Sequence, residues 1–245
     1  MKFAPLGESA VLIETGLLPD LAAPVVRQWV RALEGGMLEG VFEVVPAFTA
    51  VGIFYDAARL AREHRAAPFV TVCRWAESRV KMLAAIEPAP IREFVVPVCY
   101  AAEFGPDLEE VARATQLSPE AVVRLHASTD YEVRAVGFSP GFPYLAGLPE
   151  ELHVPRRPTP RTKVPAGSVG IGGAQTGIYS LTTPGGWNLI GRTPWVLFDP
   201  TADVPSLFQI GDRVRFEAIN AEAMATANPG PLKARSAASP RESTP

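Results

Sequence analysis

From Tyr131 onward the chain consists of short apolar runs separated by turns rich in glycine and proline. The runs read YEVRAVGF, SVGIGG, IYSLTT, NLIGRTP, WVLFDP and DRVRFEAI. Each run has the length of a single strand, and clusters of Gly and Pro mark the turns between strands. This pattern is typical of a small β-barrel or sandwich, so we expect the second part of the chain to fold in that way.

The first part of the chain alternates between strand and helix patterns. FAPLGESAVLIETG predicts two short strands around a turn at Gly7, and VFEVVPAF and TAVGIFYD predict two more. Apolar residues at helical spacing predict helices over residues 24–33, with Pro24 in the first turn, and over residues 68–86. This series predicts a compact α+β domain.

A proline-bearing joint, IEPAP at residues 86–90, predicts the boundary between two domains. We assign residues 1–87 to an N-terminal α+β domain and residues 88–222 to the β-barrel domain. The last residues, 223–245, include NPGPLKARSAASPRESTP, which lacks aromatics and periodicity, and they are expected to form a disordered tail. The predicted fold class is α+β.

Two helices are predicted just before the apolar runs. Asp107 and Glu110 have the spacing of a capping box. Ser118 and Pro119 supply an N-cap and a first-turn proline for a second helix, which is expected to end near His126. Because a helix C-terminus favours a charged imidazole, we expect the pKa of His126 near or above its usual value of about 6.5.

Residues 152–198 contain no Asp or Glu, although the whole chain has a formal net charge of −3. The formal charges in this span are Arg156, Arg157, Arg161, Lys163 and Arg192. The span also carries glycines at positions 167, 170, 172, 173, 177, 185, 186 and 191. Cations beside bare backbone N–H groups favour a bound anion. The alternative is a set of tight β-turns with solvated arginines.

Polar side chains beside these glycines complete a candidate binding site for a substrate or another anion. Arginine offers a planar fork to carboxylate or phosphate, and Gln175 both donates to and accepts from an amide or lactam. The predicted set is Arg156, Arg161, Ser168, Gln175, Thr176, Tyr179 and Arg192.

His126 and Glu103 are the predicted catalytic residues, because each moves a proton if it lines the same cleft. The alternatives are a core or cap histidine and a solvated loop acid. The three histidines and two cysteines are scattered, so no metal site is expected.

Three familiar motifs fail on their chemistry. Residues 137–141 match the G-x-S-x-G nucleophile elbow, but Pro140 follows the serine and has no N–H for an oxyanion. A dinucleotide fingerprint fails because Gln175 stands where its last glycine belongs. A Walker A loop fails because Ile178 stands in place of the phosphate-binding lysine.

Charge and composition exclude several classes of protein. An acidic chain argues against general nucleic-acid binding. Glu8 and Glu14 interrupt any secretory signal, and the glycines of residues 164–191 exclude a membrane helix from that uncharged stretch. Two cysteines without CxxC spacing suit a reducing compartment, so a cytoplasmic location is expected.

Several blocks of the sequence resemble the signature blocks of one family. They are GPDL (105–108), LH (125–126), GFSPGFPYL (137–145), PRR (155–157), PR (160–161), VPAGSVGIGGAQTGIY (164–179), TPGGWNLIGRTP (183–194) and LFDP (197–200). GESAVLIE (7–14) and VVPAFTAV (44–51) resemble the N-terminal domain of that family. It is the family of the B subunit of the bacterial ATP-dependent 5-oxoprolinase, also known as the KipI-like or allophanate hydrolase subunit 1 family.

The resemblance implies a cyclophilin-like β-barrel after an α+β domain, and two partners, the A and C subunits of 5-oxoprolinase, of which C has a related barrel. Together the three subunits open 5-oxo-L-proline to L-glutamate with hydrolysis of ATP. The resemblance leaves open which subunit binds ATP, a site shared with a partner being one alternative, and whether the active site lies in this barrel or at its border with the C subunit. Relatives usually carry two glycines where this chain has Ala101 and Ala102. Two alternatives remain open, a KipI-type inhibitor of a sensor histidine kinase and a carboxyltransferase component related to urea carboxylase.

Overall fold

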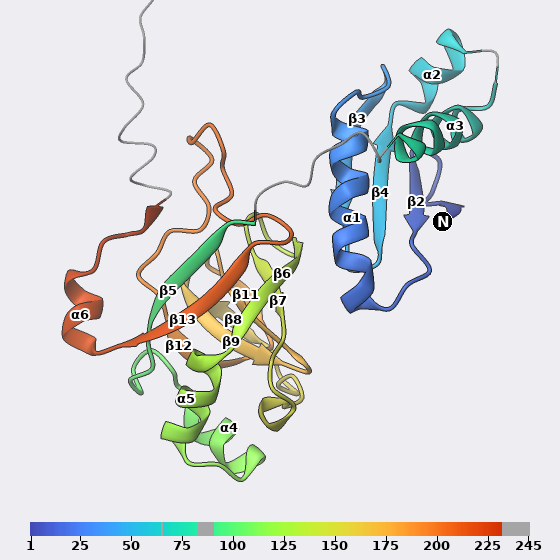
Figure 1. The fold of residues 1–245 in the computed structure, drawn as a ribbon. Helices are drawn as coiled ribbons and strands as arrows, with labels where there is room; N and C mark the ends of the chain where they lie inside the picture. The colour runs from blue at the N-terminus through green and yellow to red at the C-terminus, as the bar shows by residue number, and fades with distance from the viewer. Residues whose placement is uncertain (65, 83–90, 232–245) are drawn as a thin grey trace, which may run out of the picture. The chain divides into compact units, whose positions relative to one another are not determined.

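The structure, a computed structural model, describes residues 1–64, 66–82 and 91–231. The chain divides into two compact units, Met1–Pro90 and Ile91–Pro245. The expected joint at residues 86–90 lies outside the described residues. Helices and a sheet in the first unit and a closed barrel in the second confirm the predicted fold class (Figure 1).

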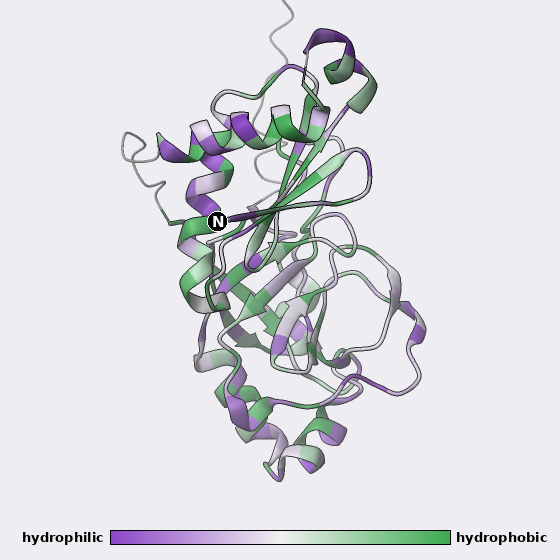
Figure 2. Ribbon diagram, turned by 90° about the vertical axis from the view of Figure 1, so that its right-hand side faces the viewer, coloured by the Kyte–Doolittle hydropathy of each residue, from purple (hydrophilic) through white to green (hydrophobic). Residues whose placement is uncertain are grey.

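The first unit is built on an antiparallel sheet with strand order β1-β2-β4-β3. Its elements are β1 (Lys2–Pro5), β2 (Ala10–Glu14), α1 (Pro19–Glu34), β3 (Val41–Pro46), β4 (Ala50–Tyr55), α2 (Ala57–Glu63) and α3 (Pro68–Lys81). Alternate strand residues such as Ile13 and Ile53 are buried in one cluster with Trp29 of α1 and Val72 of α3. The helices alternate hydrophilic and hydrophobic segments along their length, as expected when one face packs on a sheet (Figure 2).

The four strands predicted in this unit are confirmed, and Gly7 lies between the first two at φ +68°. The first helix is longer than predicted, because α1 begins at Pro19 and Pro24 lies inside it. Both prolines suit a first turn, so Pro24 alone does not fix the start of the helix. The short helix α2 was not predicted, although Asp56 caps it by accepting a hydrogen bond from the Arg59 N–H at 2.9 Å.

The second unit is a closed barrel with strand order β10-β7-β6-β13-β5-β12-β9, completed by pairing of β9 with β10. The barrel strands are β5 (Glu93–Cys99), β6 (Asp130–Val136), β7 (Pro143–Ala146), β9 (Ser168–Gly172), β10 (Gln175–Ile178), β12 (Asn188–Arg192) and β13 (Arg213–Ile219). A separate two-stranded sheet joins β8 (Arg161–Val164) to β11 (Thr183–Gly185). Apolar side chains such as Val96, Val133, Ile171 and Phe216 fill the barrel.

The last strand of the barrel, β13, lies between β5 and β6. It is parallel to β5, from the pair Arg213 and Glu93 to the pair Ile219 and Cys99, and antiparallel to β6. Figure 1 shows these three strands side by side. Just before them, Arg92 donates to the Asp212 carboxylate, with Nε 2.8 Å from Oδ1. The ends of the barrel sequence therefore meet in one seam.

Both predicted helices precede the barrel strands β6 and β7. They are α4 (Leu108–Thr115) and α5 (Pro119–Ser128), which lie together at one end of the barrel (Figure 1). Ser118 caps α5 as predicted, because its Oγ accepts a hydrogen bond from the Ala121 N–H at 3.2 Å. A short 3₁₀ turn, η2 (Glu150–Leu152), follows β7.

Two apolar runs and the start of the tail differ from prediction. IYSLTT is not one strand, because β10 ends at Ile178 and β11 begins at Thr183. WVLFDP makes only an isolated bridge, between Phe198 and Ser206, among the described residues. The first residues of the expected tail are ordered: α6 (Ala221–Thr226) is capped by Asn220, and the Val196 N–H donates to Pro229 O at 2.7 Å. These contacts to the barrel loops have no local sequence signature.

Candidate functional site

Strand alternation divides the predicted site residues between the two sides of the barrel wall. Thr176 pairs with Ile171 and Leu145, both of the barrel core, so its side chain points inward. Ser168, Gly170, Gly172 and Gly177 occupy the opposite positions of β9 and β10 and lie on the outer side. The predicted set is therefore not a single site, because the barrel wall separates its members.

His126 lies in the barrel interior with Thr176, and its side chain is 0% exposed. The imidazole stacks on Phe216 with ring centroids 4.5 Å apart. Its Nδ1 lies 2.8 Å from the Tyr100 hydroxyl, and its Nε2 lies 2.9 Å from Thr176 Oγ1. The ring thus links α5 to the end of β5 and to β10.

The hydrogen bonds of this chain assign the tautomer of His126. Thr176 Oγ1 donates its hydrogen to Gly170 O at 3.0 Å, so it accepts from His126 Nε2. The Nδ1 atom then accepts from Tyr100, whose pKa is raised well above its usual value by burial. Thr176 is therefore not an activated nucleophile, because the proton of the pair points from His126 to the threonine.

Burial lowers the pKa of His126 to about 3, because the charged imidazolium loses its hydration. The expectation of a pKa near or above 6.5 is therefore wrong. The helix-end dipole favours a charged histidine by only about 0.3–1 kcal/mol at exposed sites, and desolvation outweighs that term here. Its burial, with both ring nitrogens hydrogen-bonded, favours the alternative that His126 is a structural residue of the core.

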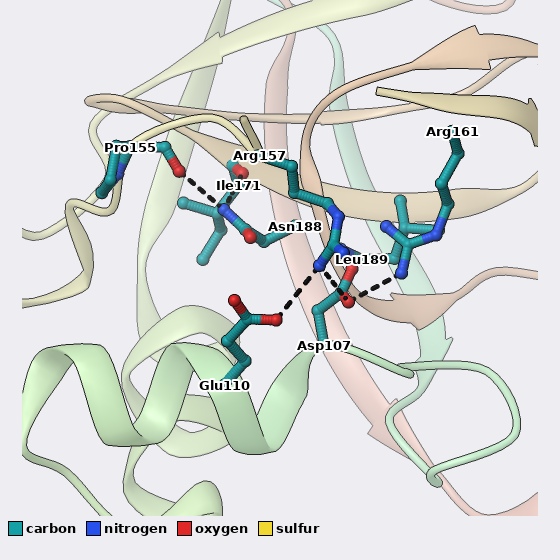
Figure 3. Close-up of polar contacts among 8 residues, drawn as sticks. All are labelled: Asp107, Glu110, Pro155, Arg157, Arg161, Ile171, Asn188 and Leu189. Atoms are coloured by element: carbon teal, nitrogen blue, oxygen red, sulfur yellow. Dashed lines mark hydrogen bonds and ion pairs between the residues drawn. The ribbon is translucent and has the colours of Figure 1, made fainter. Parts of the chain in front are cut away.

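On the outer side, Asp107 is the centre of a polar network (Figure 3). Its carboxylate is 3% exposed. Oδ1 accepts from Arg157 Nη1 at 2.9 Å and from Arg161 Nη2 at 2.7 Å. Oδ2 accepts from the Leu189 N–H at 2.7 Å. One buried carboxylate therefore joins the start of α4 to β12 and to two arginines of the acid-free segment.

This network overturns one prediction from the sequence and supplies a counter-ion that the sequence did not indicate. Asp107 makes no side-chain cap bond to α4, and Glu110 pairs with Arg157 at 3.1 Å, so the predicted capping box is absent. Arg161 has an ion-pair partner, because it shares the Asp107 carboxylate with Arg157, while Arg157 also pairs with Glu110; the predicted anion-binding role of Arg161 stays a prediction. Charge counts along the sequence missed the counter-ion because it is some 50 positions away.

The loop that carries these arginines is also held through its backbone. Asn188 donates from Nδ2 to Pro155 O at 2.9 Å and reaches Ile171 O at 3.3 Å (Figure 3). The Arg157 N–H donates to Gly186 O at 2.7 Å. The basic loop is thus a fixed part of the barrel's outer side.

Aromatic rings cover the glycines of the outer side. A Cβ on Gly172 would lie 2.7 Å from Trp187, and one on Gly177 would lie 2.9 Å from Phe142. A Cβ on Gly185 would lie 2.3 Å from the hydroxyl of Tyr179. These glycines are needed because rings lie directly on the backbone, which gives the glycine density a packing explanation.

The rings form what we call the outer aromatic cluster, which consists of Phe138, Phe142, Tyr144, Tyr179 and Trp187. Phe142 lies at its centre, with ring centroids 4.9–5.6 Å from those of its four neighbours. Tyr179 is 2% exposed, and burial raises the pKa of its phenol. Tyr179, predicted to bind substrate, is therefore a packed member of this cluster.

The side chains of the other predicted residues differ in their exposure to solvent. Arg156 is exposed, with its guanidinium 5.8 Å from the centre of the Trp187 ring, and Glu103 is exposed in a turn. Arg192 is half-buried, 5.7 Å from the centre of the Phe104 ring, and among the described residues it has no ion-pair partner. Ser168 is 0% exposed, and Gln175 is partly exposed. Arg156, Arg161, Arg192, Gln175 and Glu103 are the predicted residues whose side chains keep some exposure to solvent.

Ser139 of the rejected nucleophile elbow is 8% exposed. Ser180 Oγ donates to Pro140 O at 2.6 Å, so the hydroxyl of Ser139, 3.3 Å away, donates to Ser180. This hydrogen-bond chain fixes the loop and leaves Ser139 without an activating base.

Within the described ranges, no group of three or more His, Cys, Asp or Glu residues is arranged to hold a metal ion. In the same part of the chain, no helix is long and apolar enough to cross a membrane.

Sequence reasoning missed Asp107, Asn188, Phe142 and Trp187 as organising residues of the outer side. The sequence could have indicated an acid such as Asp107, because a segment with several cations and no acids needs a counter-ion from elsewhere in the chain. It could also have indicated the aromatic residues, because they flank the glycines in the sequence. Asn188 has no comparable signature.

Comparison with known proteins gives the class to which this fold and its outer network belong. Residues 1–208 match the family described as "Carboxyltransferase domain, subdomain C and D". A 5-oxoprolinase B subunit from Bacillus subtilis (strain 168) is 42% identical over 219 residues, 88% of this chain and 91% of that protein. Another from Escherichia coli O157:H7 is 44% identical over 212 residues, 86% and 93% of the two chains. The chain belongs to the family of 5-oxoprolinase B subunits.

Solved structures agree on the fold. The crystal structure of TTHA0988 superposes with a TM-score of 0.72 at 34% identity over 91% of this chain. That match is 41% of the TTHA0988 chain, so this chain spans less than half of its length. The urea carboxylase of Kluyveromyces lactis superposes with a TM-score of 0.69 over 95% of this chain and 22% of its own. At 19% identity, that likeness shows the fold alone.

Proposed function

We propose that this chain is the B subunit of an ATP-dependent 5-oxoprolinase, a cyclic amide hydrolase that opens 5-oxo-L-proline to L-glutamate only as a complex with its A and C subunits. The observation that carries the proposal is the 42% and 44% identity, over nearly the whole length, to relatives named as 5-oxoprolinase B subunits. The proposed partners, the ATP requirement and the cytoplasmic location follow from that family membership.

The chemistry of a stable lactam explains the need for ATP. Transfer of the γ-phosphoryl group to the lactam carbonyl oxygen makes the carbonyl carbon electrophilic. Water then adds to that carbon, the ring C–N bond breaks, phosphate leaves, and the ring nitrogen takes a proton. Such a reaction depends on charge neutralisation and positioning, which fixed cations and hydrogen-bond donors supply.

The residues of this chain suit an auxiliary part in that reaction. Arg156 is an exposed cation and Arg192 is a half-buried one, and each suits the carboxylate or the phosphoryl oxygens. Gln175 suits the lactam amide, and Glu103 is an accessible proton carrier. His126 is sealed in the core and is assigned no contact with substrate.

Reconstitution tests the proposal. The purified chain and the A and C subunits are assayed alone, in pairs and together for glutamate release from 5-oxo-L-proline with ATP. We expect turnover only with all three, because the described part of this chain offers neither an activated nucleophile nor a standard nucleotide loop. Glutamate release by the single chain would contradict the dependence on partners, and an inactive complete mixture would contradict the function.

A further inference from the structure

Ser168 and Arg192 occupy directly opposite positions on the outer side of the barrel, where the antiparallel strands β9 and β12 pair. Side chains at opposite positions of such a pair point to the same face, with Cβ atoms about 4.5–5.5 Å apart. Ser168 Oγ and Arg192 Nε are both buried, and neither has a hydrogen-bond partner among the described residues. A buried polar atom without a partner costs stability, so such atoms are rare and each needs an explanation.

The chemistry of the two atoms defines the kind of group that would satisfy them. A guanidinium nitrogen only donates a hydrogen bond, and a serine hydroxyl donates as well as accepts. A group that satisfies both atoms at once therefore accepts two hydrogen bonds. Beside a cation, the strongest acceptor is an anionic oxygen, so the pair is suited to an oxyanion.

Packing contacts hold Arg192 in place. Its guanidinium lies 5.7 Å from the centre of the Phe104 ring. Its stem passes Gly167 so closely that a Cβ there would lie 3.3 Å from Arg192 Cγ, and the φ of Gly167 is +82°. No acid of the described residues pairs with Arg192. A ring and a glycine thus fix the guanidinium without using its N–H groups, which remain for a ligand.

The surrounding charges favour a carboxylate over a phosphoryl group. Arg157 and Arg161 of the same segment share the Asp107 carboxylate. Arg157 also pairs with Glu110, so two acids balance these two arginines. Glu103, in the turn beside the site, is exposed and adds a negative charge at its edge. One unpaired cation matches the single charge of a carboxylate, whereas a phosphoryl group carries a charge of about −1.5 to −2 at pH 7.

We infer that Arg192 and Ser168 bind the carboxylate of the lactam substrate. The inference rests on the proposed function, because it assigns the part of this chain that recognises 5-oxo-L-proline. The planar fork of Arg192 donates to the carboxylate, and Ser168 donates to the oxygen nearer the barrel wall. Ser168 is 0% exposed, so the carboxylate reaches it only when the Arg192 side chain shifts outward. That shift breaks no hydrogen bond or ion pair of the Arg192 side chain with the described residues.

Kinetics of the reconstituted complex test the inference. Full-length wild type, Arg192→Gln, Arg192→Lys, Ser168→Ala and Arg215→Gln are each combined with the A and C subunits. Glutamate release is measured over a range of 5-oxo-L-proline concentrations and, separately, of ATP concentrations. Arg215 is the matched control, because this arginine of β13 lies in the same barrel, pairs with Asp130 and has a side chain that is 58% exposed.

We expect Arg192→Gln to raise the KM for 5-oxo-L-proline at least about tenfold, because charge-assisted hydrogen bonds to the carboxylate are lost. Arg192→Lys keeps the charge and loses the planar fork, so its KM should lie between those of wild type and Arg192→Gln. Ser168→Ala should raise the KM about fivefold, through the loss of one hydrogen bond. The KM for ATP should stay unchanged in every variant, and Arg215→Gln should behave like wild type.

Melting temperatures separate binding from folding. Ser168→Ala removes a buried hydroxyl that has no partner among the described residues, so it is expected to melt at or above the wild-type temperature while its KM rises. A structural role of Ser168 predicts the reverse, a lower melting temperature with an unchanged KM. That result would overturn the inference.

The kinetic constants distinguish the remaining outcomes. If the variants raise the KM for ATP and leave that for 5-oxo-L-proline unchanged, the pair binds a phosphoryl group and the carboxylate assignment is wrong. If every variant turns over like wild type, the inference fails and the proposed function stands. An inactive wild-type complex would contradict the proposed function and the inference with it.

Discussion

The inner and outer sides of β9 and β10 are built from alternate residues of the same strands, yet the two sides are packed in different ways. Inward residues such as Val169, Ile171 and Ile178 fill the barrel, and one histidine bonded to Thr176 completes it. Outward residues such as Gly170 and Gly172 have no side chains, and rings supplied by loops take their place. Polar residues that are neighbours in the sequence therefore lie in separate environments. A sequence motif is evidence for a site only once the side of the strand that each of its residues occupies is known.

The largest effect is expected on the outer side, at Asp107. Replacing it with alanine leaves two guanidinium groups and the Leu189 N–H without their acceptor. Breaking a buried ion pair from one side costs about 3–5 kcal/mol, so Asp107→Ala should destabilise the barrel unit by that amount. Denaturant unfolding of the full chain measures it.

Glu110→Ala is the control for Asp107, because it removes only the exposed partner of Arg157, whose carboxylate is 59% exposed. An exposed ion pair is worth about 0–1 kcal/mol. Equal effects of the two substitutions would show that the buried network does not hold the outer side together.

The interior gives a smaller effect that depends on pH. The pKa of His126 is about 3 in the folded chain, against about 6.5 unfolded. Between these values the unfolded chain binds the extra proton, so stability is present above pH 6.5 and is lost as the pH falls. From pH 7 to pH 5 this group should cost about 2 kcal/mol of unfolding free energy.

His126→Gln should remove that pH dependence and lower stability at pH 7, because Tyr100 and Thr176 lose a fitted partner. His153→Gln is the control, since His153 is exposed and its Nε2 lies 3.1 Å from Leu148 O. Unfolding curves at pH 5, 6 and 7 decide the matter. A variant with the wild-type pH slope would place the titrating group elsewhere.

The smallest effect is expected for Arg156, at the exposed rim of the outer side. Its cation–π contact with Trp187 is worth about 0.5–1 kcal/mol at an exposed site, so Arg156→Gln should change the unfolding midpoint little. A loss comparable with that of Asp107→Ala would show that the arginine holds the fold and is unavailable for binding.

Local patterns predicted most of the elements, because hydrophobic period and turn residues act within a few positions. Ser118 and Pro119 marked α5 correctly, and β13 followed from DRVRFEAI. Errors arose where a distant residue decided the outcome. Asp107 became the partner of Arg157 and Arg161 in place of a helix cap, and His126 was enclosed by the barrel.

The candidate site was predicted less well than the fold, for the same physical reason. A list of polar residues beside glycines does not say which side of a strand each residue occupies. Successive side chains point to opposite faces, so an error of one residue in the strand register places a side chain on the wrong side. Thr176 and Gln175 are neighbours in sequence, and one is in the core while the other is partly exposed. The roles predicted for all the site residues remain predictions, including those of Glu103, Arg156, Arg161, Gln175 and Arg192, whose side chains keep some exposure.

The seam in which β13 pairs with both β5 and β6 has a consequence during protein synthesis. A ribosome releases residues 93–99 long before residues 213–219, and the Arg92–Asp212 contact spans 120 positions. Until the last strand emerges, the nascent barrel presents two unsatisfied strand edges, which are templates for aggregation. The first unit has all its pairings within its own sequence, so it completes folding while the barrel is still open. We therefore expect a chain stalled before residue 213 to have a folded first unit and an open barrel unit that is prone to aggregation.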